Sequence, residues 1–152
     1  MSSPSPAHEH YLRGLELEEA DRRAARHAYE ECLAGDCRHL EARINLGRLL
    51  HLEGRHADAE RIYRESQDAD ATLYFNLAVL LEDLGRDHDA AQYYREAIMH
   101  DPGMADAHLN LSMLLERSGQ TQSAYRHLLA YHRLLQAHKD PADFTGEFPE
   151  DG

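Results

Sequence analysis

Residues 71–104 decide the fold, and they read ATLYFNLAVLLEDLGRDHDAAQYYREAIMHDPGM. In the first half of this stretch, apolar residues such as Leu77, Ala78 and Leu81 recur at helical spacing. Gly85 follows the last of them, and glycine readily adopts the left-handed conformation that helix C-termini favour. The first half therefore predicts a helix that ends near Gly85.

The second half of the stretch predicts another helix. Ala90 and Tyr94 lie on one face of it, where the small alanine lets a neighbouring helix approach and the tyrosine fills the remaining gap. A short polar residue near its start, Asp87 here and Thr121 further on, is expected to cap the free backbone amides. Pro102 ends the pattern because proline cannot continue a helix. The whole stretch is therefore expected to form a helix–turn–helix unit.

The same landmarks recur along the chain, which indicates an internal repeat. Asn76 and Asn110 are separated by one period of about 34 residues, and Asn45 precedes Asn76 by a period that is three residues shorter. The same two spacings separate three glycines and three alanines: Gly54, Gly85 and Gly119, and Ala59, Ala90 and Ala124. Earlier in the chain, the full period links Leu12 to Leu46, Ala25 to Ala59 and Tyr29 to Tyr63. Because independent landmarks share one period, we predict an array of similar helix pairs.

This pattern resembles the tetratricopeptide repeat (TPR), a helix–turn–helix unit of about 34 residues. The resemblance implies an all-α, right-handed superhelical solenoid of antiparallel helix pairs. We expect four units, at residues 6–39, 40–70, 71–104 and 105–138. The first is degenerate and has no glycine between its helices. The second lacks three residues, which we place in the turn Gln67–Asp70.

The ends of the repeat domain, expected over residues 7–138, differ in character. A disordered N-terminus is expected at 1–6 and an acidic, flexible tail at 139–152. The last helix, about 121–137, carries more apolar surface than one inner face needs. Its candidate self-association residues are Tyr125, Leu128, Leu129, Tyr131, Leu134 and Leu135.

Solenoids normally end in a polar cap, so this apolar surface is expected to be covered. A homodimer formed through the last helix would cover it. So would a fold-back of the tail through Phe144 and Phe148, or another domain of a longer parent chain.

The composition disfavours several classes of function. The 152 residues carry a formal net charge of −12, which argues against binding to nucleic acid or to an anionic membrane surface. No apolar run approaches the roughly 20 residues that span a bilayer, and the N-terminus does not resemble a secretory signal. Only two cysteines occur, Cys32 and Cys37, so the reducing cytoplasm is the default location.

The sequence contains no catalytic or cofactor-binding motif. It has no glycine-rich phosphate loop, no Gly-x-Ser-x-Gly elbow and no His-Glu-x-x-His motif. None of its 12 histidines pairs with another at the i, i+4 spacing that suits a metal, so we expect solvated surface histidines and no metal site. We therefore expect neither a cofactor nor an enzymatic activity.

The resemblance also suggests where a partner binds, because the first helix of each unit lines the concave face in this family. The candidate groove residues are Ile44, Asn45, Arg48, His51, Phe75, Asn76, Val79, Leu109, Asn110 and Met113. The recurring asparagines can hold the backbone of a bound peptide, since an amide both donates and accepts hydrogen bonds, or they can bond locally. The apolar members can face a ligand as an exposed stripe, or they can pack between adjacent first helices.

Some TPR domains grip acidic chaperone tails through a clamp of lysines and asparagines. The clamp lysines are absent here, and Arg48 alone supplies little positive charge to bind an acidic tail. An apolar or mildly basic segment therefore suits the groove better.

We predict a non-enzymatic protein- or peptide-binding module. The alternatives are a small chaperone for an exposed apolar segment and an oligomeric scaffold built through the last helix. Residues 74–86 and 107–111 also resemble repeats that follow a helix-turn-helix domain in some bacterial regulators.

Overall fold

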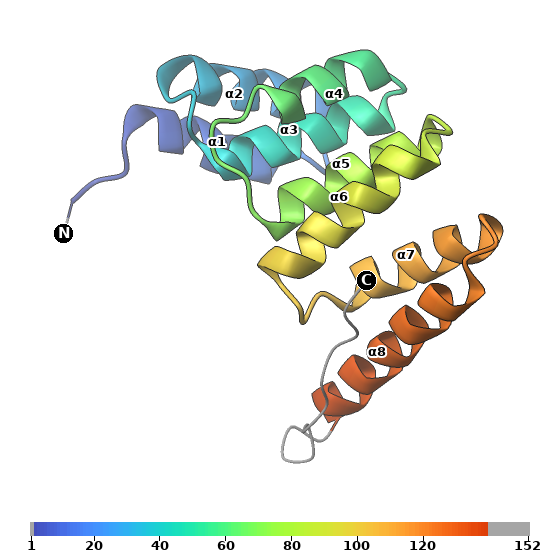
Figure 1. Ribbon diagram of the computed structural model, residues 1–152. Helices are drawn as coiled ribbons and strands as arrows, with labels where there is room; N and C mark the ends of the chain where they lie inside the picture. Colours follow the sequence, from blue (N-terminus) through green and yellow to red (C-terminus); the bar gives the residue numbers. More distant parts are fainter. Residues whose placement is uncertain (1, 140–152) are drawn as a thin grey trace. The chain divides into compact units, whose positions relative to one another are not determined.

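The chain folds into helices without strands over residues 2–139, the part that the computed structural model describes (Figure 1). Eight helices follow one another in this part: α1 (Pro6–Leu17), α2 (Arg22–Gly35), α3 (Leu40–Leu52), α4 (His56–Arg64), α5 (Ala71–Asp83), α6 (Asp87–His100), α7 (Ala105–Arg117) and α8 (Thr121–Lys139). This is the all-α solenoid of helix pairs that the sequence predicts. The expectations for Phe144, Phe148 and the rest of the tail from 140 onward lie outside the described residues.

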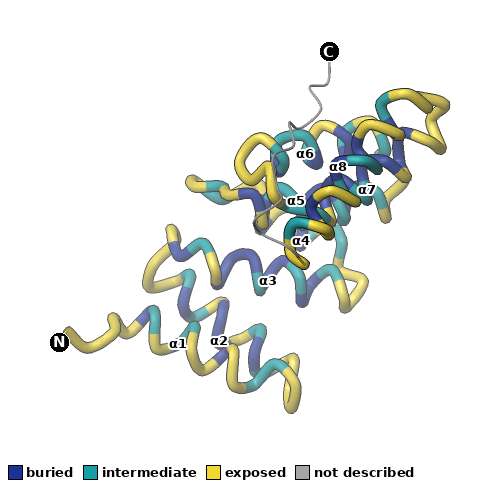
Figure 2. Tube along the Cα trace, turned by 90° about the horizontal axis from the view of Figure 1, so that it is seen from below, coloured by how far each residue is buried: buried dark blue, intermediate teal, exposed yellow. Residues whose placement is uncertain are grey.

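The helices form two compact units. One runs to Ala69 and holds α1–α4, and the other starts at Asp70 and holds α5–α8. In the first unit α1 packs on α2, α2 on α3 and α3 on α4, and in the second unit α5 packs on α6, α6 on α7 and α7 on α8. Each unit therefore contains two helix pairs, stacked through the second helix of one pair and the first helix of the next. Figure 2 shows buried positions recurring along these helices, with exposed residues at the turns.

The core combines small residues with tyrosine rings. In α6, Ala90, Tyr94 and Ala97 have no exposed surface, and they follow the i, i+4, i+7 spacing of a helix face that packs on a core. Ala59 and Tyr63 repeat the arrangement in α4, with 0% and 2% exposure. The alanines bring the paired helices close together, and each ring fills the space that they leave.

Glycine ends the first helix of three pairs, as the sequence predicts. Gly54, Gly85 and Gly119 have positive φ angles of 79°, 75° and 82°. At the α5–α6 turn, the Gly85 amide donates to the Glu82 carbonyl at 2.9 Å and the Arg86 amide donates to the Leu81 carbonyl at 2.9 Å. These two bonds form the Schellman motif, which satisfies carbonyl groups that a helix end leaves free.

The α1–α2 turn has no glycine and is built differently. The Asp21 amide donates to the Leu17 carbonyl at 2.8 Å, and the Asp21 carboxylate accepts a hydrogen bond from the Ala24 amide at 3.0 Å. Asp21 therefore closes the first helix and caps the second. This single residue replaces the glycine of the later turns.

The shorter turn shifts the first helix of the first repeat by one residue relative to its second helix. Gly14 faces the ring of Tyr29 as Gly47 faces the ring of Tyr63, and a Cβ on either glycine would overlap the ring. Gly14 is therefore the counterpart of Gly47, at a spacing one position shorter than the full period. Pairing Leu12 with the buried Leu46 is wrong, because Leu12 is 40% exposed.

The three missing residues of the second repeat shorten a helix as well as altering a turn. α4 has 9 residues, whereas its counterpart α6 has 14. Residues 65–70 are not helical. Placing the deletion within Gln67–Asp70 is therefore wrong, because the loss removes the last turn of α4 and leaves a longer link to the next helix.

Helix starts depart from the expected caps. Asp87 and Thr121 are the first residues of α6 and α8 instead of their caps. Arg86 occupies the N-cap position of α6 and makes no side-chain cap bond. Asp87 instead places a carboxylate in the first turn, where the positive end of the helix dipole favours it. α1 begins at Pro6, because the Ser5 hydroxyl accepts a hydrogen bond from the His8 amide at 3.2 Å.

Candidate functional site

A polar network joins α5, α6 and α7 in the second unit. The buried hydroxyl of Tyr94 donates a hydrogen bond to Glu82 Oε1 at 2.7 Å. Asn110 Nδ2 donates to the same hydroxyl at 3.4 Å. Arg117 Nη2 donates to Glu82 Oε2 at 2.9 Å and lies 3.6 Å from Asp87 Oδ2. α7 is thus tied to the preceding helix pair through an asparagine and an arginine.

The first unit repeats this network between α1, α2 and α3. The Tyr29 hydroxyl donates to Glu18 Oε1 at 2.6 Å, and Asn45 Nδ2 donates to that hydroxyl at 3.4 Å. Arg48 Nη2 lies 2.6 Å from both carboxylate oxygens of Glu18. Burial and the hydrogen bond to glutamate raise the pKa of the tyrosine in both networks. The asparagines of both networks therefore bond locally, which was one of the two alternatives that the sequence left open.

The tyrosine of the intermediate repeat lacks such a network. Tyr63 is 2% exposed, and its hydroxyl has no hydrogen-bond partner among the residues that the structure describes. His51 occupies the position of Glu18 and Glu82 in this repeat. Burial raises the pKa of Tyr63. Sequence reasoning missed these networks, although a glutamate 11 or 12 residues before a core tyrosine is a visible signal.

The apolar groove candidates differ in exposure. Met113 in α7 is 53% exposed. The half-buried members are Phe75 and Val79 in α5 and Leu109 in α7. The Phe75 ring also packs edge-on against Tyr94, with 5.8 Å between ring centroids. Ile44 is only 7% exposed, so its side chain belongs to the core, and for this residue the structure favours packing over an exposed stripe, the two alternatives that the sequence left open.

The polar groove candidates lie mostly in the first unit. Asn45, Arg48 and His51 are half-buried along α3. The His51 ring meets the His56 ring edge-on at 5.4 Å. Asn76 is half-buried in α5. Each unit therefore has its own candidate surface, polar in the first unit and largely apolar in the second.

The last helix is partly exposed, as expected, but not at every candidate. Tyr125 and Leu135 are 60% and 39% exposed. Leu128, Leu129 and Tyr131 are half-buried. Leu134 is 6% exposed and belongs to the core, so its expected role in self-association is wrong.

Sequence reasoning missed a second surface of the same unit, because it joins residues of two helices. Tyr74 in α5 and Tyr93 in α6 stack with 6.0 Å between ring centroids. With Met99 and three polar residues of α6 they line a pocket of about 620 Å³. Met99 is 74% exposed. Five of its six lining residues belong to α6 and Tyr74 belongs to α5, and none of the six is among the residues predicted to bind a partner.

Several histidines are buried, contrary to the expectation of solvated surface histidines. His39, His108 and His127 are 9%, 0% and 2% exposed. Nδ1 of His108 lies 3.0 Å from Nδ1 of His127, and Nδ1 of His8 lies 3.0 Å from Nε2 of His39. The His108–His127 pair joins α7 and α8, and the His8–His39 pair joins α1 to the residue that caps α3.

No group of three His, Cys, Asp or Glu side chains within residues 2–139 is arranged to hold a metal ion. None of the helices in that part of the chain is both long and apolar enough to cross a membrane.

Comparison with known families identifies the repeat. Two tetratricopeptide-repeat models match the chain, one over residues 15–73 and the other over residues 71–104. The chain belongs to the tetratricopeptide repeat family. No curated protein matches the sequence.

Solved TPR proteins share the fold. MamA from Desulfovibrio magneticus RS-1 matches with a TM-score of 0.75 and 18% identity, over 88% of this chain and 78% of that chain. The Pseudomonas aeruginosa protein pilF matches with a TM-score of 0.79 and 19% identity, over 92% and 72%. YrrB, described as a TPR protein with an unusual peptide-binding site, matches with a TM-score of 0.71 and 17% identity, over 90% and 70%. Identities of this size show the shared fold alone.

Proposed function

We propose that the chain is a non-enzymatic interaction module that binds a partner segment along the exposed faces of its first helices. The observation that carries the proposal is Met113, which is 53% exposed in α7 at the repeat position that Val79 holds in α5. Val79 is half-buried, so both positions keep accessible apolar surface, and such surface on successive first helices is one that a partner can bury. Membership of the TPR family supports this role, because such repeats present extended binding surfaces.

The proposed partner segment is apolar and either uncharged or mildly basic. Arg48 is the permanent cation among the candidates, and Glu18 already neutralises it. The net charge of −12 also repels acidic segments. Asn76 offers an amide that can donate to and accept from a bound backbone. The peptide-binding site described for YrrB, which shares the fold, agrees with a peptide as the ligand.

Two exposed methionines provide a matched test of this surface. Met113→Glu places a charge on the proposed binding face of a first helix. Met99→Glu makes the same change at a 74% exposed position of the second helix α6. Because both side chains are exposed, both variants should keep the helical content and the melting temperature of the unmodified chain. Phe75→Glu is a poorer test, because that ring packs on Tyr94.

The experiment is affinity capture from a lysate of the source organism, followed by mass spectrometry. We expect partners that the unmodified chain captures to be lost with Met113→Glu and kept with Met99→Glu. Partners that survive Met113→Glu would contradict the proposal. A purified partner then separates the two forms of the function, because a chaperone keeps an otherwise insoluble client in solution and an adaptor does not.

The cytoplasm is the proposed location. Cys32 is buried and Cys37 is exposed, and neither forms a disulfide. Unpaired thiols of this kind are typical of a reducing compartment.

A further inference from the structure

At the end of the second unit, α7 and α8 present a surface equivalent to the one that α5 and α6 present one repeat earlier. A pocket of about 170 Å³ opens between α7 and α8, lined by Ser112, Glu116, Thr121, Ala124, Tyr125 and Leu128. One full period earlier in the sequence, these positions correspond to Ala78, Glu82, Asp87, Ala90, Ala91 and Tyr94. α7 packs on α6, and Glu82, Asp87 and Tyr94 of this preceding set bond to α7 side chains.

The contacts of α7 show what such a face receives. Arg117 reaches back to Glu82 Oε2 at 2.9 Å and to Asp87 Oδ2 at 3.6 Å. The first unit repeats the pattern, since Arg48 of α3 pairs with Glu18 at 2.6 Å. In both units the glutamate near the end of a first helix therefore receives an arginine from the helix that packs next.

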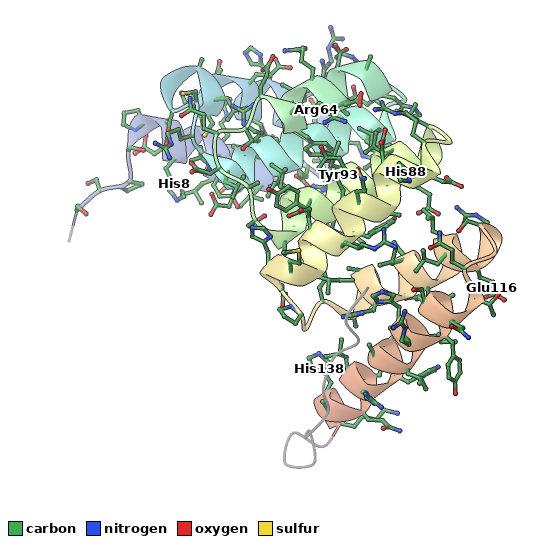
Figure 3. The ribbon with its side chains drawn as sticks, viewed as in Figure 1. His8, Arg64, His88, Tyr93, Glu116 and His138 are labelled. Atoms are coloured by element: carbon green, nitrogen blue, oxygen red, sulfur yellow. The ribbon has the colours of Figure 1, made fainter. Side chains whose placement is uncertain are left out.

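At the last repeat the glutamate is present and its cation is missing. Glu116 occupies the position of Glu82, is exposed, and has no side-chain hydrogen bond or ion pair within the described part of the chain. Figure 3 shows its side chain projecting at the end of α7, near the turn into α8. Leu128 replaces the core tyrosine, and Tyr125, which replaces Ala91, is 60% exposed. The surface is thus an apolar patch beside an unpaired carboxylate.

We propose that this end face binds an amphipathic helix of a partner protein, which packs apolar side chains on Leu128 and Tyr125 and directs an arginine or lysine to Glu116. The helix would repeat the position that α7 takes on the preceding pair. Helices dock on such faces through apolar anchors at i, i+3, i+4 and i+7. The apolar anchors of this site lie on α8, whereas the proposed function rests on Met113 of α7, so different variants test the two proposals.

A second copy of the chain is a poor occupant of this face. In the register set by Gly14, its first helix has Leu15 at the position of Arg48, and Glu19 follows that helix at the position of Arg117. Glu19 would therefore meet Glu116 with like charge. The net charge of −12 on each copy adds to the repulsion.

A peptide with the sequence of α7 can serve as the test ligand, because α7 itself packs on the equivalent face of the preceding helix pair. The probe is a synthetic, end-capped peptide with the α7 sequence ADAHLNLSMLLER, titrated into the full chain and followed by the heteronuclear NMR spectrum. We expect saturable shifts at Thr121, Tyr125 and Leu128. Glu116→Arg should weaken binding by roughly fivefold, the effect of one partly exposed ion pair. Tyr125→Glu should weaken it further.

Charge exchange makes the test specific. A peptide with its last arginine replaced by glutamate should bind the unmodified chain weakly and the Glu116→Arg variant at nearly the original affinity. Glu19→Arg changes the net charge equally at an exposed site in the other unit and should leave binding unchanged.

Three results would overturn the proposal. One is no binding up to the solubility limit of the peptide. Another is an affinity that Glu116→Arg does not change, as expected if the peptide only exchanges with α7. The third is binding that appears only after Phe144 and Phe148 are replaced by serine, which would make the tail the occupant of this face.

Discussion

Three tyrosines at equivalent repeat positions provide a sharp test of the polar networks. Tyr29→Phe and Tyr94→Phe each remove a buried hydroxyl that donates to a glutamate, at 2.6 Å and 2.7 Å. Tyr63→Phe removes a buried hydroxyl that has no hydrogen-bond partner within the described residues. The same chemical change should therefore alter stability in different directions.

The expected magnitudes follow from these contacts. A hydrogen bond to a charged group contributes about 1.5–3 kcal/mol. Because Glu18 and Glu82 keep their arginine partners, we expect the lower part of this range, about 1.5–2 kcal/mol, for Tyr29→Phe and Tyr94→Phe. Losing an unpaired buried hydroxyl removes a desolvation penalty, so Tyr63→Phe should be neutral or stabilising by about 1 kcal/mol.

Urea and thermal unfolding followed by circular dichroism measure these differences. For a chain of this size each kcal/mol moves Tm by about 2–4 °C. Tyr29→Phe and Tyr94→Phe should melt several degrees below the unmodified chain, and Tyr63→Phe at or above it. If Tyr63→Phe destabilised the protein as much as the other two, the loss would not depend on the hydrogen bond from the hydroxyl to glutamate, and the reasoning would be refuted.

Three further predictions concern single residues. Gly85→Ala forces a side chain into a turn with φ of 75° and should cost about 1–2 kcal/mol of unfolding free energy, measured in urea. Burial raises the pKa of Cys32 to about 11, so at pH 8 a disulfide reagent should modify exposed Cys37 quickly and Cys32 slowly; equal rates would contradict the buried placement. The Arg38 guanidinium holds the pKa of the Asp68 carboxyl below its usual value. The stabilisation from this pair is therefore present above the ordinary carboxyl pKa and is lost as pH falls through the lowered one, and carboxyl NMR titration should show the Asp68 pKa rising in Arg38→Gln.

The fold could be predicted from the sequence because its determinants are local and periodic. Apolar spacing, the three positive-φ glycines and Pro102 each act within one helix or one turn. The apolar spacing and the glycines recur in different parts of the chain, which made the repeat visible. The one-residue shift of the first helix of the first repeat could not be found this way, because it depends on the ring of Tyr29 needing a glycine beside it, which is Gly14 and not the Arg13 that the full period places there.

The candidate site was less predictable, because exposure depends on which helices pack together. Ile44 and Leu134 have the same residue types as their exposed neighbours, yet tertiary packing buries them at 7% and 6% exposure. The buried pair of His108 and His127 joins two helices 19 residues apart, a spacing with no helical meaning in the sequence. Contacts between polar side chains of different helices can be identified only once the packing of the helices is known.

Site-specific photo-crosslinking tests most directly whether the exposed face of the first helices binds the partner. A photoreactive phenylalanine analogue replaces Met113 in one variant and Met99 in a second, both at positions more than half exposed. Irradiation in living cells of the source organism, followed by mass spectrometry, identifies what each position touches. We predict a discrete crosslinked partner from position 113 and none from position 99. Crosslinks from position 99 alone would contradict this prediction and assign binding to the pocket that Tyr74 of α5 lines with Tyr93 and Met99 of α6.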